Sequence, residues 1–170
     1  MTEVSGFAPV DNPSARALIL GSMPGVASLA AGQYYAHPRN AFWRLMGDIT
    51  GAGPELPYDQ RLARLRAHGL ALWDVLRSCQ RPGSLDADIR PASMVANDFA
   101  GFLARHPDIR LIAFNGATAE SSFMRHALPA LTPALQARLR LLRLPSTSPA
   151  HAGMTYAAKL TVWREALGAV

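Results

Sequence analysis

Residues 16–25 read Arg-Ala-Leu-Ile-Leu-Gly-Ser-Met-Pro-Gly, and this stretch decides the fold. The apolar run at 16–20 is short and ends at a glycine, which is typical of a buried strand. The first loop, residues 21–25, contains two glycines and a proline and predicts a tight turn whose backbone N–H groups can point at a ligand. Its spacing fits neither a Walker loop nor a dinucleotide-binding fingerprint. Taken alone, it is equally consistent with an ordinary connection between a strand and a helix.

The remaining chain alternates short apolar runs with helical spacings. The apolar runs predict three further strands, at 70–73, 110–114 and 140–144. Periodic apolar residues, caps and breakers predict helices at 39–50, 58–68 and 95–105, between Gly116 and about His126, after Thr132-Pro133 and after Thr155, with loops at 51–57 and 78–94. Strands that alternate with helices form a parallel sheet covered on both faces. We therefore predict a three-layer α/β/α fold around a four-stranded parallel sheet.

Length and composition indicate one domain over residues 1–170, with 1–14 as an N-terminal extension. A chain of 170 residues with 49% hydrophobic and 17% charged residues has enough apolar material for a core. No apolar run approaches the roughly 20 residues that span a membrane, and the first residues lack the pattern of a signal peptide. The single Cys79 excludes an intramolecular disulfide and a cysteine-ligated iron–sulfur cluster. We expect a cytoplasmic protein with no membrane partner, no metal and no cofactor.

The basic residues of this chain are almost all arginine. The net charge is +5 and, of the 17 basic residues, only Lys159 is a lysine. Arginine suits bidentate contacts to phosphate, and a basic surface suits a polyanionic partner. An arginine-rich and lysine-poor composition is also what a high-GC coding bias produces. Charge alone therefore leaves nucleic-acid binding open.

Four segments follow the predicted strands directly, and they are the candidates for a site. In open parallel sheets, ligands bind beyond the carboxyl ends of the strands. This rule singles out the first loop, Asp74, Asn115-Gly116 and Pro145–His151. We expect them to lie along one edge of the fold.

Residues 33–43 read Gln-Tyr-Tyr-Ala-His-Pro-Arg-Asn-Ala-Phe-Trp and carry the most informative polar group. Exposed aromatic residues before a helix are suited to stacking on a flat base. Asn40 lies where the helix is expected to begin, on the same side of the sheet as the strand ends. The alternative is that Asn40 only caps the helix and that the two tyrosines belong to the core.

The late loop, residues 145–154, combines hydroxyls, a histidine and small residues. Hydroxyls and backbone N–H groups bind phosphate without sequence preference, so Ser146 and Ser148 are candidates for phosphate contacts. His151 is a candidate for stabilising negative charge that develops in a reaction. A solvated histidine or one bonded only to the protein is the alternative.

Taken together, these motifs resemble the uracil-DNA glycosylase superfamily. The resemblance covers about residues 15–168 and is carried by the first loop, Tyr34–Trp43, the run Ala-Leu-Trp-Asp-Val at 71–75, and Leu144–Gly153. Their combination is most similar to the hypoxanthine-DNA glycosylase branch, also called DNA-deoxyinosine glycosylase. The order of the motifs and their positions at four strand ends make the set specific.

The resemblance implies a fold, a substrate and a set of roles. It implies a four-stranded parallel sheet between helices, and a damaged base that is flipped out of DNA into a pocket at the strand ends. It implies Asn40 and His151 as catalytic residues. The residues implied to bind the base are Gly21, Ser22, Met23, Pro24, Tyr35, Asp74 and Asn115, and those implied to bind DNA are Arg39, Ser146, Ser148, His151, Ala152, Gly153 and Met154.

Two departures from the family pattern, together with Asp74, bear on the expected substrate. Relatives carry Asp or Asn in the first loop to position the attacking water, whereas this chain has Met23, which cannot do so. In the hypoxanthine branch this role passes to an Asn in the second motif, which matches Asn40. Relatives also carry His before the late Pro-Ser, where this chain has Leu144; His151 is a candidate replacement. Asp74 falls where uracil-specific relatives place an Asn that reads the edge of the base.

The single lysine bears on the type of chemistry. A glycosylase that also cuts the DNA backbone uses an amine to form a Schiff base. Lys159 lies in the predicted last helix, where we expect it to be away from the loop ends. A mechanism that uses water is therefore favoured over one that uses an amine.

The predicted function is that of a monofunctional DNA glycosylase, acting as a monomer on single- or double-stranded DNA that contains a deaminated base. Hypoxanthine is the expected base, with xanthine and uracil as further substrates. A uracil-specific enzyme is one alternative. A non-catalytic module that binds damaged DNA and a nucleoside hydrolase acting on free nucleosides are alternatives of other classes.

Overall fold

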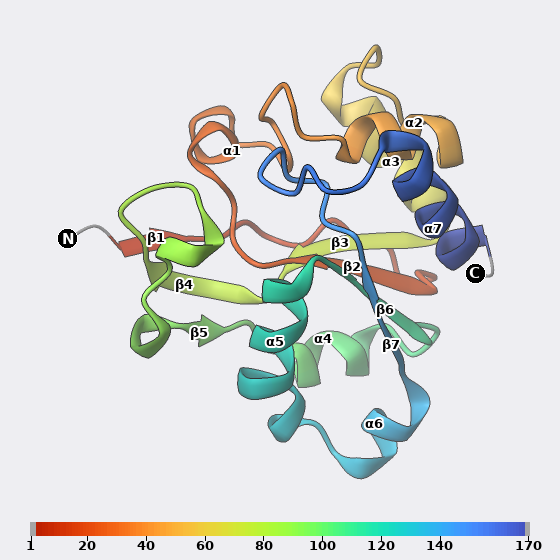
Figure 1. Cartoon of the computed structure of the whole chain (residues 1–170). Helices are drawn as coiled ribbons and strands as arrows, with labels where there is room; N and C mark the ends of the chain where they lie inside the picture. The colour runs from red at the N-terminus through yellow and green to blue at the C-terminus, as the bar shows by residue number, and fades with distance from the viewer. Residues whose placement is uncertain (1–2, 169–170) are drawn as a thin grey trace.

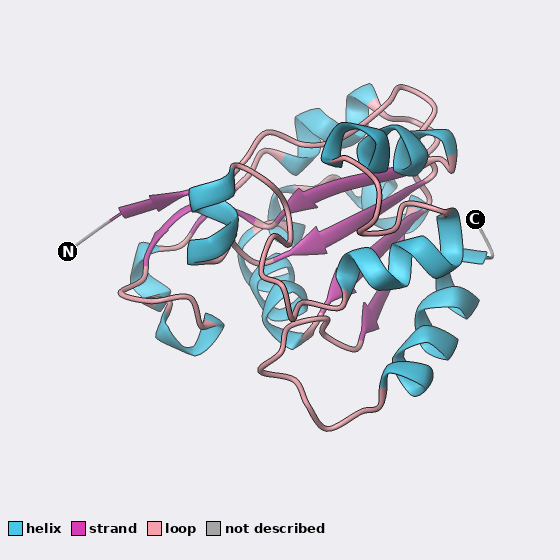
Figure 2. Ribbon diagram, turned by 90° about the horizontal axis from the view of Figure 1, so that it is seen from above, coloured by secondary structure: helices cyan, strands magenta, loops and turns pink. Residues whose placement is uncertain are grey.

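The computed structural model describes residues 3–168 and contains a sheet of four parallel strands between helices (Figures 1 and 2). The strand order is β3-β2-β6-β7. The strands are β2 (Ala17–Gly21), β3 (Leu70–Asp74), β6 (Leu111–Asn115) and β7 (Arg140–Leu144). All four coincide with predicted strands to within a residue or two at their ends, and the predicted three-layer α/β/α fold is confirmed.

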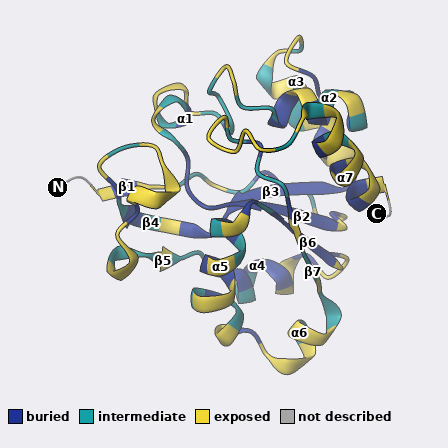
Figure 3. Cartoon of the chain, in the orientation of Figure 1, coloured by how far each residue is buried: buried dark blue, intermediate teal, exposed yellow. Residues whose placement is uncertain are grey.

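Helices cover both faces of this sheet. In Figure 1, α2 (Phe42–Thr50), α3 (Tyr58–Ala67) and α7 (Tyr156–Gly168) lie above it, and α4 (Phe99–Arg105), α5 (Ala117–His126) and α6 (Pro133–Arg138) lie below it. Alternate residues of β2 face opposite layers: Ile19 packs in one apolar cluster, and Leu18 and Leu20 pack in the other. Because both faces are buried, the strand is apolar throughout rather than alternating (Figure 3).

A second, smaller sheet was not predicted from the sequence. Its order is β1-β4-β5, with antiparallel pairing of β1 (Glu3–Ser5), β4 (Leu76–Gln80) and β5 (Val95–Ala96). The expected loop at 78–94 was therefore wrong in part, because it begins inside β4 and contains the short 3₁₀ helices η1 (Asp86–Asp88) and η2 (Pro91–Ser93). The expected helix at 95–105 begins only at Phe99, since the Asp98 side chain caps it by accepting a hydrogen bond from the Gly101 N–H.

The predicted N-terminal extension is paired with the rest of the chain. Strand β1 lies against β4, and Val10 bridges to Leu72 of β3. The predicted domain span of 1–170 includes residues 1–2 and 169–170, which lie outside the described residues. The remaining short elements are α1 (Val26–Ala31) and η3 (Leu128–Ala130). None of the described helices is long and apolar enough to cross a bilayer.

Candidate active site

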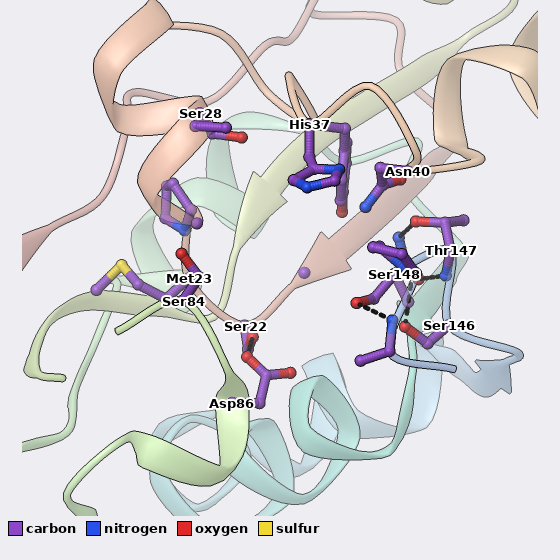
Figure 4. Close-up of a pocket in the computed structure, with 18 of the residues that line it drawn as sticks. Ser22, Met23, Ser28, His37, Asn40, Ser84, Asp86, Ser146, Thr147 and Ser148 are labelled. Atoms are coloured by element: carbon purple, nitrogen blue, oxygen red, sulfur yellow. Dashed lines mark hydrogen bonds between the residues drawn. The ribbon is translucent and has the colours of Figure 1, made fainter. Parts of the chain in front are cut away.

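A pocket of about 420 Å³ opens at the carboxyl ends of the parallel strands. Residues from all four strand ends line it, together with residues 34–40 and a short stretch at 84–86 (Figure 4). The predicted residues that line it are Gly21, Ser22, Met23, Pro24, Tyr35, Arg39, Asn40, Asp74, Asn115, Ser146 and Ser148. The lining ends at Ala150; the next three residues, His151, Ala152 and Gly153, are exposed, and Met154 is half-buried. The late loop thus runs from the pocket out to the surface.

Asp74 lies at the floor of the pocket. Its side chain is buried, and its Oδ2 atom has no hydrogen-bond partner within residues 3–168. The pKa of Asp74 is raised to about 7, chiefly by burial and also by the nearby Asp86 carboxylate, while Arg81 opposes the shift. A carboxyl group with this pKa exists in both protonation states near neutral pH, so it can accept or donate a hydrogen bond.

Gly21 leaves room for the two polar groups that face each other across it. A Cβ atom at this position would lie 2.5 Å from the Asp74 Oδ1 and 2.8 Å from the Tyr35 hydroxyl. Both distances are too short for any side chain, so glycine is required here for packing and not for its backbone conformation. The Tyr35 hydroxyl, like the Asp74 Oδ2, is buried without a partner in the described part of the chain. Both atoms therefore keep unused hydrogen-bonding capacity beside the pocket.

Tyr34 and Tyr35 have different roles. Tyr34 borders the pocket, but it is 4% exposed and its carbonyl accepts a hydrogen bond from the Trp43 indole N–H at 2.8 Å, so it belongs mainly to the core. Tyr35 lines the pocket, and its ring stacks on the Phe42 ring at a centroid distance of 4.1 Å. Its backbone has φ of 54°, a value that is uncommon for a bulky residue and costs about 1–3 kcal/mol. Packing holds the ring in place despite this strain.

Asn40 combines the two roles that the sequence left open. Its Oδ1 accepts a hydrogen bond from the Phe42 N–H at 3.0 Å at the start of α2, while the residue lines the pocket. The assignment of the amide oxygen follows from this bond, and it leaves the Nδ2 group available to the cavity (Figure 4). Asn40 therefore bonds the first N–H of α2 from the position before the cap residue Ala41, and it presents a hydrogen-bond donor to the pocket.

His37 is a lining residue that was not among the predicted site residues. Its Nδ1 accepts a hydrogen bond from the Arg39 N–H at 3.1 Å. In the neutral ring this fixes the proton on Nε2, which can then act as a donor. Figure 4 shows the His37 ring next to Asn40 at the cavity. The only signal in the sequence was its place three residues before Asn40.

The segment 81–86 forms a wall of the pocket, and the sequence predicted only a loop there. Ser22 donates a hydrogen bond from its hydroxyl to the Asp86 Oδ1 at 2.6 Å. The Arg81 Nη2 donates to the Pro24 carbonyl at 2.6 Å, and the Val26 N–H donates to the Ser84 hydroxyl at 2.9 Å. Three hydrogen bonds therefore fasten this segment to the first loop and to the residue after it.

The late loop is fastened to β6 and α7. Asn115 and Thr147 exchange two hydrogen bonds of 2.9 Å, so the Asn115 amide positions the loop rather than facing a ligand alone. The Lys159 Nζ donates to the carbonyls of Ser146 and His151, both at 2.7 Å. The expectation that Lys159 lies away from the loop ends was wrong: α7 carries its amine directly beneath the late loop. Its two carbonyl partners occupy the amine, and the pocket lining does not include it.

Replacing Lys159 with methionine is expected to destabilise the late loop. The ammonium group is buried, so its loss leaves two carbonyls without a donor at a cost of about 1–3 kcal/mol. For the DNA substrate that the resemblance implies, we expect the dissociation constant to rise at least tenfold while the rate of cleavage at saturating enzyme changes less than threefold. Titration and single-turnover assays measure the two quantities. A change in rate without a change in affinity would contradict this role for Lys159.

Comparisons with known proteins identify the family of this chain. The family model for the uracil DNA glycosylase superfamily matches residues 8–167. The chain is 39% identical over 112 residues to a protein named hypoxanthine DNA glycosylase from Methanosarcina barkeri, and the matched region covers 65% of this chain and 70% of the relative. A protein of the same name from Methanosarcina acetivorans is 39% identical over 115 residues, 67% of this chain and 72% of the relative.

A solved structure extends the similarity to the fold. The solution NMR structure of a candidate uracil DNA glycosylase from Methanosarcina acetivorans superimposes with a TM-score of 0.75 at 32% identity. It covers 98% of this chain and 99% of that chain. The family model, the two relatives and this structure agree, and the chain belongs to the uracil DNA glycosylase superfamily.

Proposed function

We propose that this DNA glycosylase removes hypoxanthine from DNA by hydrolysing the N-glycosidic bond, without cutting the backbone. Membership of the superfamily and two relatives named for hypoxanthine make it a DNA glycosylase that acts on deaminated bases. One observation carries the choice of mechanism: the side-chain amide N–H donor that faces the pocket belongs to Asn40 and not to a residue of the first loop. This is the arrangement expected when Met23 replaces a water-positioning side chain.

In the proposed complex, the flipped base stacks on Tyr35 and its edge meets Asp74. The Tyr35 ring is supported from behind by Phe42, so it forms a rigid platform. The unpartnered Asp74 Oδ2 can accept a hydrogen bond from the N1–H of hypoxanthine. Uracil and xanthine carry equivalent N–H groups, which is why they are proposed as weaker substrates. Gly21 allows the base to approach both polar groups closely.

Cleavage requires one water molecule and a way to stabilise two charges. The bond between C1′ and the base nitrogen breaks, the sugar becomes positive and the base becomes negative. Asn40 holds the water that adds to C1′, and the proton released ends on the departing base or in solvent. Backbone N–H groups of the first loop and the Nε2–H of His37 stabilise the base. His37 thus takes the role that was predicted for His151.

The late loop is proposed to hold the DNA outside the pocket. Ser146 and Ser148 are candidates to contact phosphates, with Arg39 at the rim. The exposed stretch from His151 to Gly153, together with Met154, would enter the space left by the flipped base. Asn115 acts indirectly, through its two hydrogen bonds to Thr147.

Replacing His37 with alanine is expected to slow single-turnover cleavage of a deoxyinosine duplex by about 100-fold, the usual cost of losing one donor to a developing anion. The matched variant is His151→Ala, because that histidine is exposed beyond the lining. It is expected to weaken DNA binding while leaving the saturating rate within threefold. If His151→Ala lowers the saturating rate and His37→Ala does not, the two roles are reversed.

A panel of oligonucleotides tests the function itself. Duplexes and single strands containing deoxyinosine, deoxyxanthosine or deoxyuridine are incubated with the protein, and abasic sites are then cut with alkali. We expect cleavage at deoxyinosine to be the fastest, with strands intact before alkali. Cleavage of deoxyuridine alone would indicate a uracil-specific enzyme, and binding without abasic sites would indicate a non-catalytic module. Hydrolysis of free inosine would indicate a nucleoside hydrolase.

A further inference from the structure

We propose that Asp86 is a further catalytic residue, whose carboxylate stabilises the positive charge that develops on the deoxyribose as the base leaves. This inference rests on the proposed function. Asp86 comes from the short helix η1, outside every motif that carried the family resemblance. Its assignment depends on where the segment 81–86 lies in the structure.

Asp86 lies at the right place in the pocket. It is one of the lining residues, and Figure 4 shows it beside Ser22, on the wall away from His37 and Asn40. It is close enough to Asp74 and Tyr35 for its charge to raise the pKa of both groups. Asp74 and Tyr35 mark the end of the pocket proposed to hold the base, and in that complex we place the sugar of the flipped nucleotide beside Asp86.

Asp86 is the carboxylate of this pair that is better able to remain ionised. Burial is the largest cause of the raised pKa of Asp74, whose Oδ2 has no partner in the described part of the chain. Desolvation also raises the pKa of Asp86, but the Ser22 hydroxyl and the Arg81 guanidinium both oppose that shift. The residue is also more exposed than Asp74. Two carboxyl groups in different surroundings are a common basis for different roles in one site.

Arg81 fixes the segment that leads to this carboxylate. Its side chain is 3% exposed, its Nε donates to the Gly83 carbonyl at 2.5 Å, and its Nη2 donates to the Pro24 carbonyl at 2.6 Å. The segment before Asp86 is therefore fixed to the first loop before DNA binds. A charge that is already in place stabilises a transition state without the cost of reorganising the site.

The first loop cannot provide this charge. Met23 carries no charge, and Ser22 is engaged as the donor to Asp86. Apart from the tyrosines, the other titratable side chains that line the pocket are Arg39 and His37, which cannot stabilise a cation, and Asp74, which is proposed to meet the base. Asp86 forms no covalent bond in this step: C1′ loses the base, gains the oxygen of water, and the proton leaves with the base or solvent.

Two abasic-site analogues test the proposal through charge alone. One duplex contains a cationic pyrrolidine in place of the deoxyribose, and the other contains the neutral tetrahydrofuran. We expect the wild-type protein to bind the cationic analogue at least about tenfold more tightly, as one favourable pair of charges in a partly desolvated site allows. Asp86→Asn is expected to lose this preference and to slow single-turnover cleavage about 100-fold.

The controls separate charge from folding. Asp88→Asn lies in the same short helix, outside the lining, and is expected to keep both the preference and the rate. Ser22→Ala is expected to reduce the preference partly, because it removes the hydroxyl that orients Asp86. Since asparagine can still accept the Ser22 bond, Asp86→Asn should melt within a few degrees of the wild type.

Several outcomes would overturn the proposal. These are a wild-type protein that binds both analogues equally, an Asp86→Asn variant that keeps the preference, and a loss of preference only in Asp74→Asn. Cleavage of deoxyinosine duplexes with any of these results would reject the role of Asp86 but not the proposed function. A protein that cuts none of the damaged oligonucleotides would instead reject the proposed function.

Discussion

Replacing Asn40 with alanine is expected to slow single-turnover cleavage of a deoxyinosine duplex by about 100-fold or more, the usual contribution of a group that positions a reactant in the transition state. The reason is that the Asn40 Nδ2 group is the donor offered to the pocket where Met23 offers none. The measurement uses excess enzyme, so that the observed rate reports the chemical step and not product release.

A second substitution separates the catalytic role of Asn40 from its structural one. The Asn40 Oδ1 accepts a hydrogen bond from the Phe42 N–H at the start of α2, and removing such a bond costs about 1 kcal/mol. Asn40→Ser keeps an acceptor for this N–H but has no amide. We expect the serine variant to melt close to the wild type and to cleave as slowly as the alanine variant. If serine restores the rate, Asn40 only supports the helix.

Replacing Asp74 with asparagine is expected to shift the preference from hypoxanthine towards uracil by about tenfold or more, the scale on which a mismatched buried polar contact discriminates between substrates. An asparagine amide has its N–H donors on the nitrogen and its acceptor on the oxygen. Either oxygen of a carboxyl group can accept a hydrogen bond, and either can donate one when it is protonated. Rates on matched deoxyinosine and deoxyuridine duplexes give the ratio. An unchanged ratio would remove Asp74 from base reading.

The same substitution has a consequence for stability that depends on pH. Because burial raises the pKa of Asp74 to about 7 in the folded protein, the folded state holds this proton more tightly than the unfolded state. This contribution to stability is fully present below the unfolded pKa of about 4 and is lost as the pH rises through about 7. Each unit of pKa difference corresponds to about 1.4 kcal/mol. Relative to the wild type, Asp74→Asn should therefore melt higher at about pH 8 than at about pH 5.

Much of the architecture was predictable because it depends on local patterns. Strands β2, β3 and β6 are apolar runs that end at Gly21, Asp74 and Asn115, β7 ends at Leu144 just before Pro145, and the geometry of a parallel sheet brings those ends together. The sequence alone is therefore enough to mark a residue that follows such a strand as a candidate for the site. The small sheet of β1, β4 and β5 escaped prediction because its strands are short and pair residues far apart in sequence.

The residues that the sequence missed are those whose position depends on distant contacts. Asp86 reaches the pocket because Arg81 and Ser84 form hydrogen bonds with the backbone of residues 24 and 26. No local sequence pattern predicts these two hydrogen bonds. Lys159 belongs to a helix far along the chain, yet packing of α7 brings its amine to the late loop. For His37, the sequence could not tell which ring nitrogen would accept a hydrogen bond from the backbone and which would be left to face the pocket.

The strained backbone of Tyr35 has a consequence for how this protein can evolve. Glycine adopts a φ of 54° with less strain than tyrosine does. A substitution to glycine would therefore relieve backbone strain, but it would also remove the ring that stacks on Phe42. Removing a packed aromatic ring costs about 3–5 kcal/mol, which exceeds the strain that glycine would relieve, so the exchange would lower stability as well as remove the ring. The packing around residue 35 therefore keeps an aromatic side chain at a backbone conformation that, taken alone, favours glycine.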